Sequence, residues 1–444
     1  MGPGPKARAP GLPPSPVLRE DAPVSRPIPR RAFLRRSLGA AAVLPSLGAL
    51  LAACARTPDL PTEVGSASPL PILPGVPVLD SELPLEQGAT LRVYEWKEYL
   101  SSRVLAAFER AYADVGVRIE VESFFHIDEA VARLQDPASD FDVFFPTIDV
   151  LPSLAAAGIL RPLNHDYLPN LANLWAWFRE GDGPFYDPGQ RFTTPYTIYS
   201  SGIGWRADTV RVQDAPDALD DPFSVFLNER YAGEVGMYDD YLEALSLGLQ
   251  RGGVEDLRAA SDAELAVAAD FLREAVRRAG LAFTVDGAQE GLAEQTFAVH
   301  QAWSGDILSA PRYAADEGDD PAEVASALRY WSPPGTSKVV GCDLTAICAA
   351  GKSPVLAHAF LNHLLAFDVA LDNFTWNGYQ VPMDGAGPDD FADPSFPWHG
   401  AVPANLRATI ISPEEFAAGQ WLVGVGPSER ARWLDQWKRV VPSR

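Results

Sequence analysis

The chain has 444 residues, of which 47% are hydrophobic and 21% charged, which is enough for one large two-lobed unit or two domains. It contains 59 acidic and 36 basic residues; outside residues 1–53 the formal charge is -29. Such a surface repels nucleic acid and anionic lipid and attracts cations, although the charge alone is better explained by general solubility or adaptation to salt. We therefore expect no nucleic-acid partner.

Cysteine and histidine usage excludes two kinds of structural site. Three cysteines are too few for a disulfide framework. Cys342 and Cys348 flank an apolar stretch whose extended length of roughly 20 Å exceeds disulfide reach, so we expect core side chains or free thiols. His358 and His363 lie on different faces of a predicted helix, and we expect no metal and no cofactor.

The N-terminus has the pattern of an export signal. A proline-rich and basic segment, residues 1–29, precedes Arg30-Arg31, an uncharged run at 37–53 and the sequence Leu-Ala-Ala-Cys that ends at Cys54. The paired arginines resemble a twin-arginine signal, and the ending resembles a lipoprotein cleavage box. We therefore expect export, with Cys54 lipidated at the outer face of the membrane or in a periplasm.

The alternative for the same segment is a single spanning helix. Seventeen residues interrupted by Gly39, Pro45 and Gly48 make a marginal span. Residues 54–88 contain seven prolines and are predicted to be a semi-rigid tether, and no later segment is apolar for long enough to cross a membrane.

The rest of the chain alternates between strand and helix patterns. Strands are predicted at 91–96, 118–124, 141–146, 234–238, 297–303 and 343–349. Helices are predicted from about 102, at 127–135 and 149–157, from about 240, and at 262–278 and 354–367. This order predicts an α/β fold with predominantly parallel sheet, whose ligands bind at the carboxyl ends of the strands. Two stretches of apolar and small residues, 195–205 and 337–343, are candidate connections between two lobes.

Four motifs occur in an order that is similar to one family. They are LRVYEWKEYL, FDVFFPTIDVLPSLAAAGILRPL, TTPYTIYSSGIGW and QAWSGD. Together they resemble the periplasmic spermidine/putrescine-binding proteins of bacterial ABC importers, over about residues 90–440. The resemblance implies a type II periplasmic-binding-protein fold, two lobes joined by hinge strands, no catalysis, a permease as partner and a monomer.

The expected organisation follows from the resemblance and the N-terminal signals. The expected segments are a signal peptide (1–53), a lipidated cysteine with its tether (54–88), lobe 1 (89–203 plus 341–385) and lobe 2 (204–340 plus 386–444).

The resemblance also implies a ligand pocket. The expected pocket residues are Trp96, Glu98, Tyr99, Thr147, Asp149, Asp240, Glu243, Trp303, Asp343 and Tyr379. Aromatic faces suit a polyamine because they bury its methylenes and attract its ammonium groups. Trp96 at a strand end is equally well explained as a core residue. Asp240 and Glu243 also match a helix capping box, although the resemblance favours ligand contact.

Several positions depart from the family pattern. Asp149 and Gly341 stand where aromatic residues are usual, Leu422 replaces an amide, Val285 replaces a hydroxyl, and Thr147 is a mild change. The pocket is thus expected to lose two stacking faces and two hydrogen-bonding groups and to gain one carboxylate. A cationic ligand remains expected, and a shorter or more polar cation or a guanidino compound is as suitable as spermidine.

Two functions of other classes compete with solute capture. Paired carboxylates in a cleft also suit a secreted lipoprotein hydrolase, and an adhesive lipoprotein needs no pocket. The sequence contains no GxSxG and no HExxH motif. Gly351-Lys352-Ser353 is not a phosphate loop, because Ala346 replaces the leading glycine and Pro354 follows.

Overall fold

The computed structural model describes residues 70, 72–148, 150–180, 187–317, 320–422 and 427–441. The expected signal peptide, Cys54 and Asp149 lie outside these residues. Within the described chain, no single helix is long and apolar enough to cross a bilayer, and α11 (Pro354–Leu364) with α12 (Phe367–Asn377) meets that test only as a pair bent by 76°.

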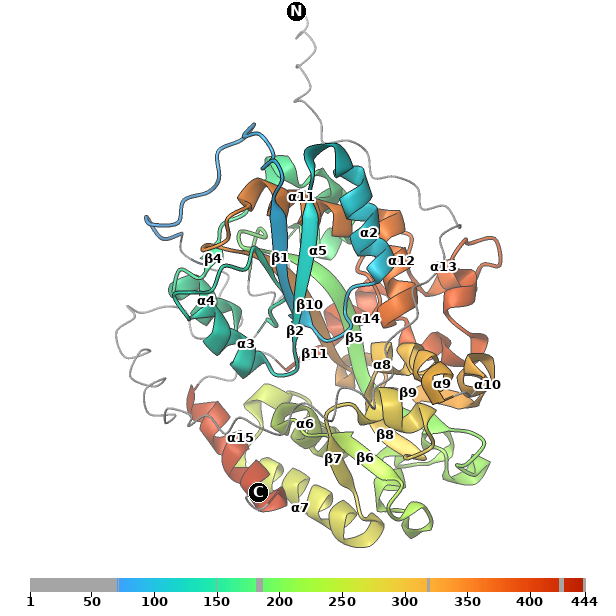
Figure 1. Cartoon of the computed structure of the whole chain (residues 1–444). Coiled ribbons are helices and arrows are strands. Elements are labelled where there is room, and N and C mark those ends of the chain that lie inside the picture. Colours follow the sequence, from blue (N-terminus) through green and yellow to red (C-terminus); the bar gives the residue numbers. More distant parts are fainter. Residues whose placement is uncertain are drawn as a thin grey trace, which may run out of the picture.

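In the described part of the chain, eleven strands form one twisted sheet that runs through the molecule (Figure 1). They are β1 (Thr90–Trp96), β2 (Arg118–Phe124), β3 (Val143–Phe144), β4 (Leu160–Arg161), β5 (Thr193–Arg206), β6 (Val235–Tyr238), β7 (Ala282–Thr284), β8 (Val299–Trp303), β9 (Leu328–Trp331), β10 (Val339–Cys348) and β11 (Gln420–Trp421). The main order is β2-β1-β3-β10-β5-β8-β6-β7.

The pairing is parallel at both ends of this order and antiparallel in its centre. β1 pairs in parallel with β2 and β3, and β6 with β7 and β8. β5 and β10 run antiparallel to each other and to most of their neighbours. The α/β prediction is confirmed, and the expected parallel pairing holds within each lobe. The expectation of parallel pairing fails for β5 and β10, because each of these two central strands passes from one lobe to the other.

The helices cover the two faces of the sheet. They are α2 (Ser102–Ala111), α3 (Ile127–Leu134), α4 (Leu151–Ala156), α5 (Ala176–Glu180), α6 (Tyr241–Arg251), α7 (Asp262–Ala279), α8 (Ser304–Ser309), α9 (Pro311–Glu317), α10 (Pro321–Ala327), α11 (Pro354–Leu364), α12 (Phe367–Asn377), α13 (Pro388–Ala392), α14 (Pro413–Ala418) and α15 (Pro427–Val440).

Local chemistry sets the ends of the longest helix, α7. Ser261 and Glu264 form a reciprocal capping box at its start, which satisfies two backbone N–H groups. Gly280 ends the helix in the left-handed conformation at φ 62°, which glycine adopts without strain. The predicted helix at 262–278 is therefore confirmed to within one residue at its end.

Hydrophobic clusters define two bodies, which Figure 1 shows one above the other. Lobe 1, the upper body, holds the clusters around Phe144 and Phe360, and lobe 2 holds those around Leu245 and Ile307. β5 belongs to both, since Ile198 packs in lobe 1 and Ile203 in lobe 2. At about 3.3 Å per residue, its 14 residues extend about 45 Å, which is enough to cross both bodies.

The C-terminal part of the chain is divided between these bodies. Phe391, Phe416 and Trp421 pack in lobe 1, whereas Trp433 on α15 packs in lobe 2. Residues 386–444 were expected in lobe 2. We propose instead that most of 386–422 belongs to lobe 1 and that only α15 returns to lobe 2, because these aromatic side chains are buried against lobe 1.

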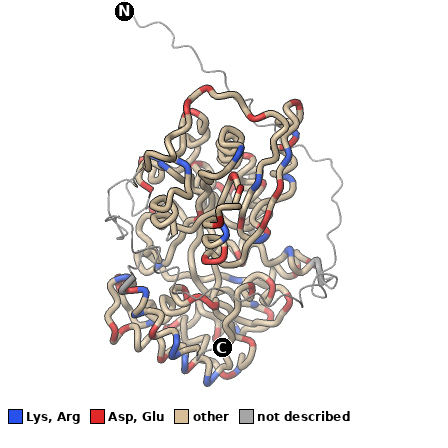
Figure 2. The backbone as a smooth tube through the Cα atoms, turned by 60° about the vertical axis from the view of Figure 1, so that its left-hand side comes forward, with Lys and Arg blue, Asp and Glu red and all other residues tan. Residues whose placement is uncertain are grey.

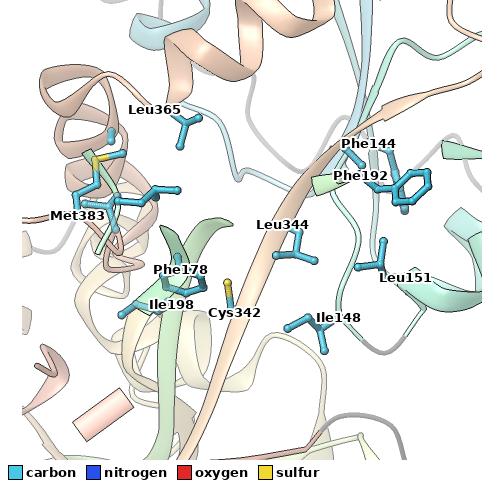
Figure 3. Packing of buried hydrophobic residues seen from close by; sticks show 14 of the residues in the cluster. Phe144, Ile148, Leu151, Phe178, Phe192, Ile198, Cys342, Leu344, Leu365 and Met383 are labelled. Carbon is cyan, nitrogen blue, oxygen red and sulfur yellow. The ribbon is translucent and has the colours of Figure 1, made fainter. Parts of the chain in front are cut away.

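The two central cysteines behave as small apolar side chains. Cys342 lies among Ile148, Leu344 and Ile198 in the core of lobe 1 (Figure 3). Cys342 and Cys348 are both buried and free, and burial raises the pKa of each thiol. The prediction of core thiols is confirmed.

Charged residues of both signs occur in both lobes. Acidic and basic positions are interspersed along the backbone of both lobes (Figure 2). In the described part of the chain no group of three His, Cys, Asp or Glu side chains is arranged to hold a metal ion.

Candidate ligand-binding site

A cavity of about 300 Å³ lies between the lobes. This volume is at the lower end of the range for small-molecule sites. Its described lining includes eight aromatic side chains (Trp96, Tyr99, Phe124, Phe125, Tyr199, Trp303, Tyr313 and Tyr379) and six acidic ones (Asp240, Glu243, Asp286, Glu290, Asp306 and Asp343). Among the described lining residues one side chain, that of Lys97, is basic.

Lobe 1 contributes Trp96, the last residue of β1, and Thr147, which follows β3. Trp96 is half-buried, packs against Phe124 with 4.5 Å between ring centroids, and has an indole N–H that is buried without a protein partner. The hydroxyl of Thr147 is likewise buried and unpartnered. Buried donors of this kind cost free energy unless water or a ligand satisfies them. The Trp96 indole and the Thr147 hydroxyl are thus suited to hydrogen-bond a ligand, and the Trp96 ring also packs against Phe124.

Asp343 lies on β10 where the strand crosses between the lobes. The register with β5 shifts directly after Asp343, which leaves Tyr196 as an extra residue on β5. Such a register shift changes the direction in which the neighbouring side chains point. The Asp343 carboxylate accepts a hydrogen bond from the hydroxyl of Tyr99, which also bonds Thr197 at 2.6 Å. Burial and the Asp343 charge together raise the pKa of Tyr99, which keeps the phenol protonated as a donor.

Lobe 2 contributes Asp240 and Glu243 from the start of α6. One Asp240 oxygen accepts from the backbone N–H of Leu242 at 2.8 Å and of Glu243 at 3.0 Å, so Asp240 is the helix cap. Glu243 does not complete a capping box. Its carboxylate turns toward the cavity and accepts from the indole of Trp303 at 2.8 Å and from Ser201 at 3.2 Å. The capping interpretation therefore applies to Asp240 only.

The buried carboxyl group of Glu243 has a raised pKa. Burial raises its pKa from 4.5 to about 7, against the lowering effect of the Trp303 hydrogen bond and with a smaller raising effect of the Asp240 charge. Near neutral pH the empty site therefore holds this group partly protonated, and a nearby cation favours its ionised form.

Asp306, a residue that the sequence reasoning missed, holds the Tyr379 hydroxyl in place. Its carboxylate accepts from the hydroxyls of Tyr379 and Tyr238, both at 2.5 Å, and from the amide of Gln289 at 2.8 Å. Burial raises its pKa to about 6. Its position in the QAWSGD motif, three residues after Trp303, was the available signal.

Tyr199 was also missed, and it supplies an aromatic face. Gly341 pairs with Tyr199 across β10 and β5, and a Cβ built on Gly341 would lie 2.2 Å from the Tyr199 ring. The Tyr199 ring therefore fills the space beside Gly341, and its centroid lies 5.7 Å from that of Trp303. The stacking face expected to be lost at Gly341 is thus replaced from the neighbouring strand.

Glu98 is the one described candidate that does not line the cavity. It adopts φ 59°, and its carboxylate turns to Arg312 at 3.2 Å and to the hydroxyl of Tyr313 at 2.9 Å. The structure thus brings Trp96, Tyr99, Thr147, Asp240, Glu243, Trp303, Asp343 and Tyr379 together and leaves Glu98 on the rim. Val285 and Leu422, two of the departing positions, do line the cavity.

Comparison with known proteins agrees with this architecture. A putrescine/agmatine-binding protein of Pseudomonas aeruginosa is 25% identical over 302 residues, covering 65% of this chain and 77% of that protein. The putrescine-binding periplasmic protein of Escherichia coli is 25% identical over 285 residues, covering 63% and 74%.

Solved structures share the fold at low sequence identity. A lipoprotein of Treponema pallidum superposes with a TM-score of 0.62 at 19% identity, covering 79% of this chain and 99% of that one. A spermidine/putrescine ABC transporter substrate-binding protein of Streptococcus pneumoniae gives 0.61 at 19% identity, covering 80% and 98%. The model of the family described as bacterial extracellular solute-binding protein matches residues 103–397. The chain therefore belongs to the bacterial extracellular solute-binding proteins.

Proposed function

We propose that this protein captures a polyamine outside the cytoplasm and delivers it to an ABC importer. The observation that carries the proposal is the convergence of six acidic and eight aromatic side chains on one cavity between two lobes. Relatives of similar length are putrescine-binding proteins, which supports the same ligand class.

The chemistry of the cavity matches a chain of methylenes that ends in ammonium groups. Asp343 and Glu243 face the cavity from opposite lobes, so that one ligand is able to bridge them. An ammonium group placed between buried carboxylates regains in the site the interactions that it loses with water. The aromatic faces of Trp96, Trp303 and Tyr199 cover the methylenes, each worth about 0.8 kcal/mol when buried.

Binding without chemistry is part of the proposal. Two carboxyl groups that line the cavity and have a raised pKa, Glu243 and Asp306, both accept hydrogen bonds from protein donors, an arrangement that suits holding a cation. Solute capture followed by release to a permease requires only lobe closure and opening.

We further propose that the protein is anchored by a lipid on Cys54 and that it binds its ligand as a monomer. The Leu-Ala-Ala-Cys sequence supports cleavage before Cys54, and the proline-rich residues 55–88 provide a spacer between membrane and cavity.

Titration calorimetry with putrescine, agmatine, spermidine, arginine and a neutral sugar tests the function. Putrescine or another polyamine should bind, and Glu243→Gln should weaken it by about 2–5 kcal/mol, because a buried charge pair is lost. Asp217→Asn removes an exposed acid outside the cavity and should leave binding unchanged. Binding of the sugar alone would overturn the proposal.

A further inference from the structure

The floor and the mouth of the cavity differ in chemistry. The floor holds Glu243, Asp306 and Asp343, which are 6%, 4% and 9% exposed. At the mouth, Phe125 from lobe 1 and Val285 from lobe 2 are 47% and 45% exposed although both line the cavity. Buried carboxyl groups thus lie at the floor and exposed apolar side chains at the mouth.

The mouth is built symmetrically from the two edge strands. Phe125 directly follows β2 and Val285 directly follows β7, the strands at the two ends of the sheet order. Half-buried Ile127, Leu242 and Leu422 extend the same apolar surface around the opening. Apolar side chains from both lobes therefore face the entrance at the carboxyl ends of strands, the edge at which ligands bind in such sheets.

The one basic side chain of the described lining, that of Lys97, lies at the mouth. The Lys97 ammonium lies 5.3 Å from the centroid of the Phe125 ring and 3.9 Å from a Glu290 carboxylate oxygen. A second ammonium group of a ligand would meet this positive charge on the Phe125 face. Asp286, beside Val285, and the exposed Asp240 also line this part of the cavity, so the positive charge of Lys97 is local to the Phe125 face.

We propose that the natural ligand is an amine that carries an apolar substituent at one end. Its ammonium end lies among the floor carboxylates, and its alkyl or aryl end lies between Phe125, Val285 and Leu422. The inference rests on the proposed function and narrows it to a substrate class. Val285 and Leu422 are then specificity-determining residues, because they replace the hydroxyl and the amide that the sequence resemblance leads us to expect there.

Titration calorimetry on the mature protein, with putrescine and its N-butyl and N-benzyl derivatives as ligands, tests the inference. Each fully buried methylene tightens binding by about fourfold, so the substituted amines should bind at least about tenfold more tightly than putrescine. Val285→Ser and Leu422→Gln should each reduce this ratio severalfold. Val267→Ser, an equally conservative change at a 61% exposed position on α7, should leave the ratio unchanged.

The outcomes separate this inference from the proposed function. Putrescine that binds as tightly as its substituted derivatives overturns the inference and leaves polyamine capture standing. If Val285→Ser weakens the binding of all three ligands by the same factor, the inference is also overturned, because the valine then does not recognise the substituent. Failure of every amine to bind overturns the proposed function itself.

Discussion

The guanidinium of Arg312 on α9 lies 3.2 Å from the carboxylate of Glu98, and this ion pair joins lobe 2 to lobe 1 beside the cavity. The same guanidinium stacks 4.4 Å from the ring centroid of Trp376 on α12 and donates to its carbonyl at 2.8 Å. Trp376 in turn donates its indole N–H to the Glu98 carbonyl at 3.1 Å. Tyr313, which lines the cavity, also donates to the Glu98 carboxylate at 2.9 Å, so these contacts link the lobes at the edge of the site.

Arg312→Met should therefore shift the ligand-free protein toward a more open form. The pair is partly exposed, so its loss together with the stacking contact should cost roughly 1 kcal/mol, which is about fivefold in affinity for any ligand that requires closure. Small-angle scattering should show a larger radius of gyration for the ligand-free variant, and calorimetry should show the weaker binding.

Arg273→Met is the matched control, because it breaks an exposed ion pair with Asp270 within α7 alone. Its radius of gyration and affinity should equal those of the unchanged protein. If Arg312→Met also matches the unchanged protein in both measurements, the contact does not bias the lobes.

The raised pKa of Glu243 predicts how stability depends on pH. The folded protein holds this proton more tightly than the unfolded chain, whose glutamates titrate near 4.5. The free energy of unfolding of the ligand-free protein should therefore fall as pH rises from about 4.5 to 7, by roughly 3 kcal/mol from this group. Denaturant titrations at pH 5, 6, 7 and 8 measure the slope, which Glu243→Gln should reduce and Asp217→Asn should not.

Ligand binding should show the opposite pH dependence. A cation in the site favours the ionised carboxylates, so its affinity should rise between pH 5 and 8, and binding near pH 6 should release protons from Glu243 and Asp306. Calorimetry in two buffers of different ionisation enthalpy counts these protons. Proton uptake on binding would contradict the placement of the cation beside these groups.

Most of the framework was predictable because its signals are local. The strand at 91–96, the helix from Ser102 and the strand at 118–124 all appear as expected, since alternation and helical spacing depend on neighbouring residues only. The helix expected at 354–367 ends earlier, at Leu364, and α12 begins at Phe367 after a sharp bend.

The site was less predictable because it depends on contacts between distant segments. The Tyr199 ring takes the place of the aromatic side chain that was expected to be missing at Gly341. This arrangement follows from the register of β5 with β10, which the sequence does not state. Glu98 was assigned to the pocket from its place between Trp96 and Tyr99. Its positive φ turns the side chain to the rim instead.

The proposed lipidation of Cys54 predicts where the protein is found in cells. The Cys54→Ser variant should lose its lipid and appear in the soluble extracytoplasmic fraction, because the thiol is the acceptor in the proposed cleavage box. Labelling with a fatty-acid analogue followed by fractionation measures both effects. A variant that remains in the membrane would indicate that residues 37–53 stay uncleaved as a spanning segment.

The packing of Tyr199 against Gly341 predicts that a single methyl group disturbs the aromatic lining. In Gly341→Ala the new Cβ would lie 2.2 Å from the Tyr199 ring, so the ring has to move away from its place 5.7 Å from Trp303. Affinity for a polyamine should fall by about tenfold, the equivalent of one aromatic face, with a smaller effect on melting temperature.

Gly75→Ala is the control for that substitution, since a Cβ there meets no atom within 4 Å. It should change neither affinity nor melting temperature. Tyr199→Leu should weaken polyamine binding by a similar factor, and combining it with Gly341→Ala should add little, because the alanine acts by displacing the ring that leucine removes. Losses that add in full in the double variant would show that Gly341 affects the site by a route other than Tyr199.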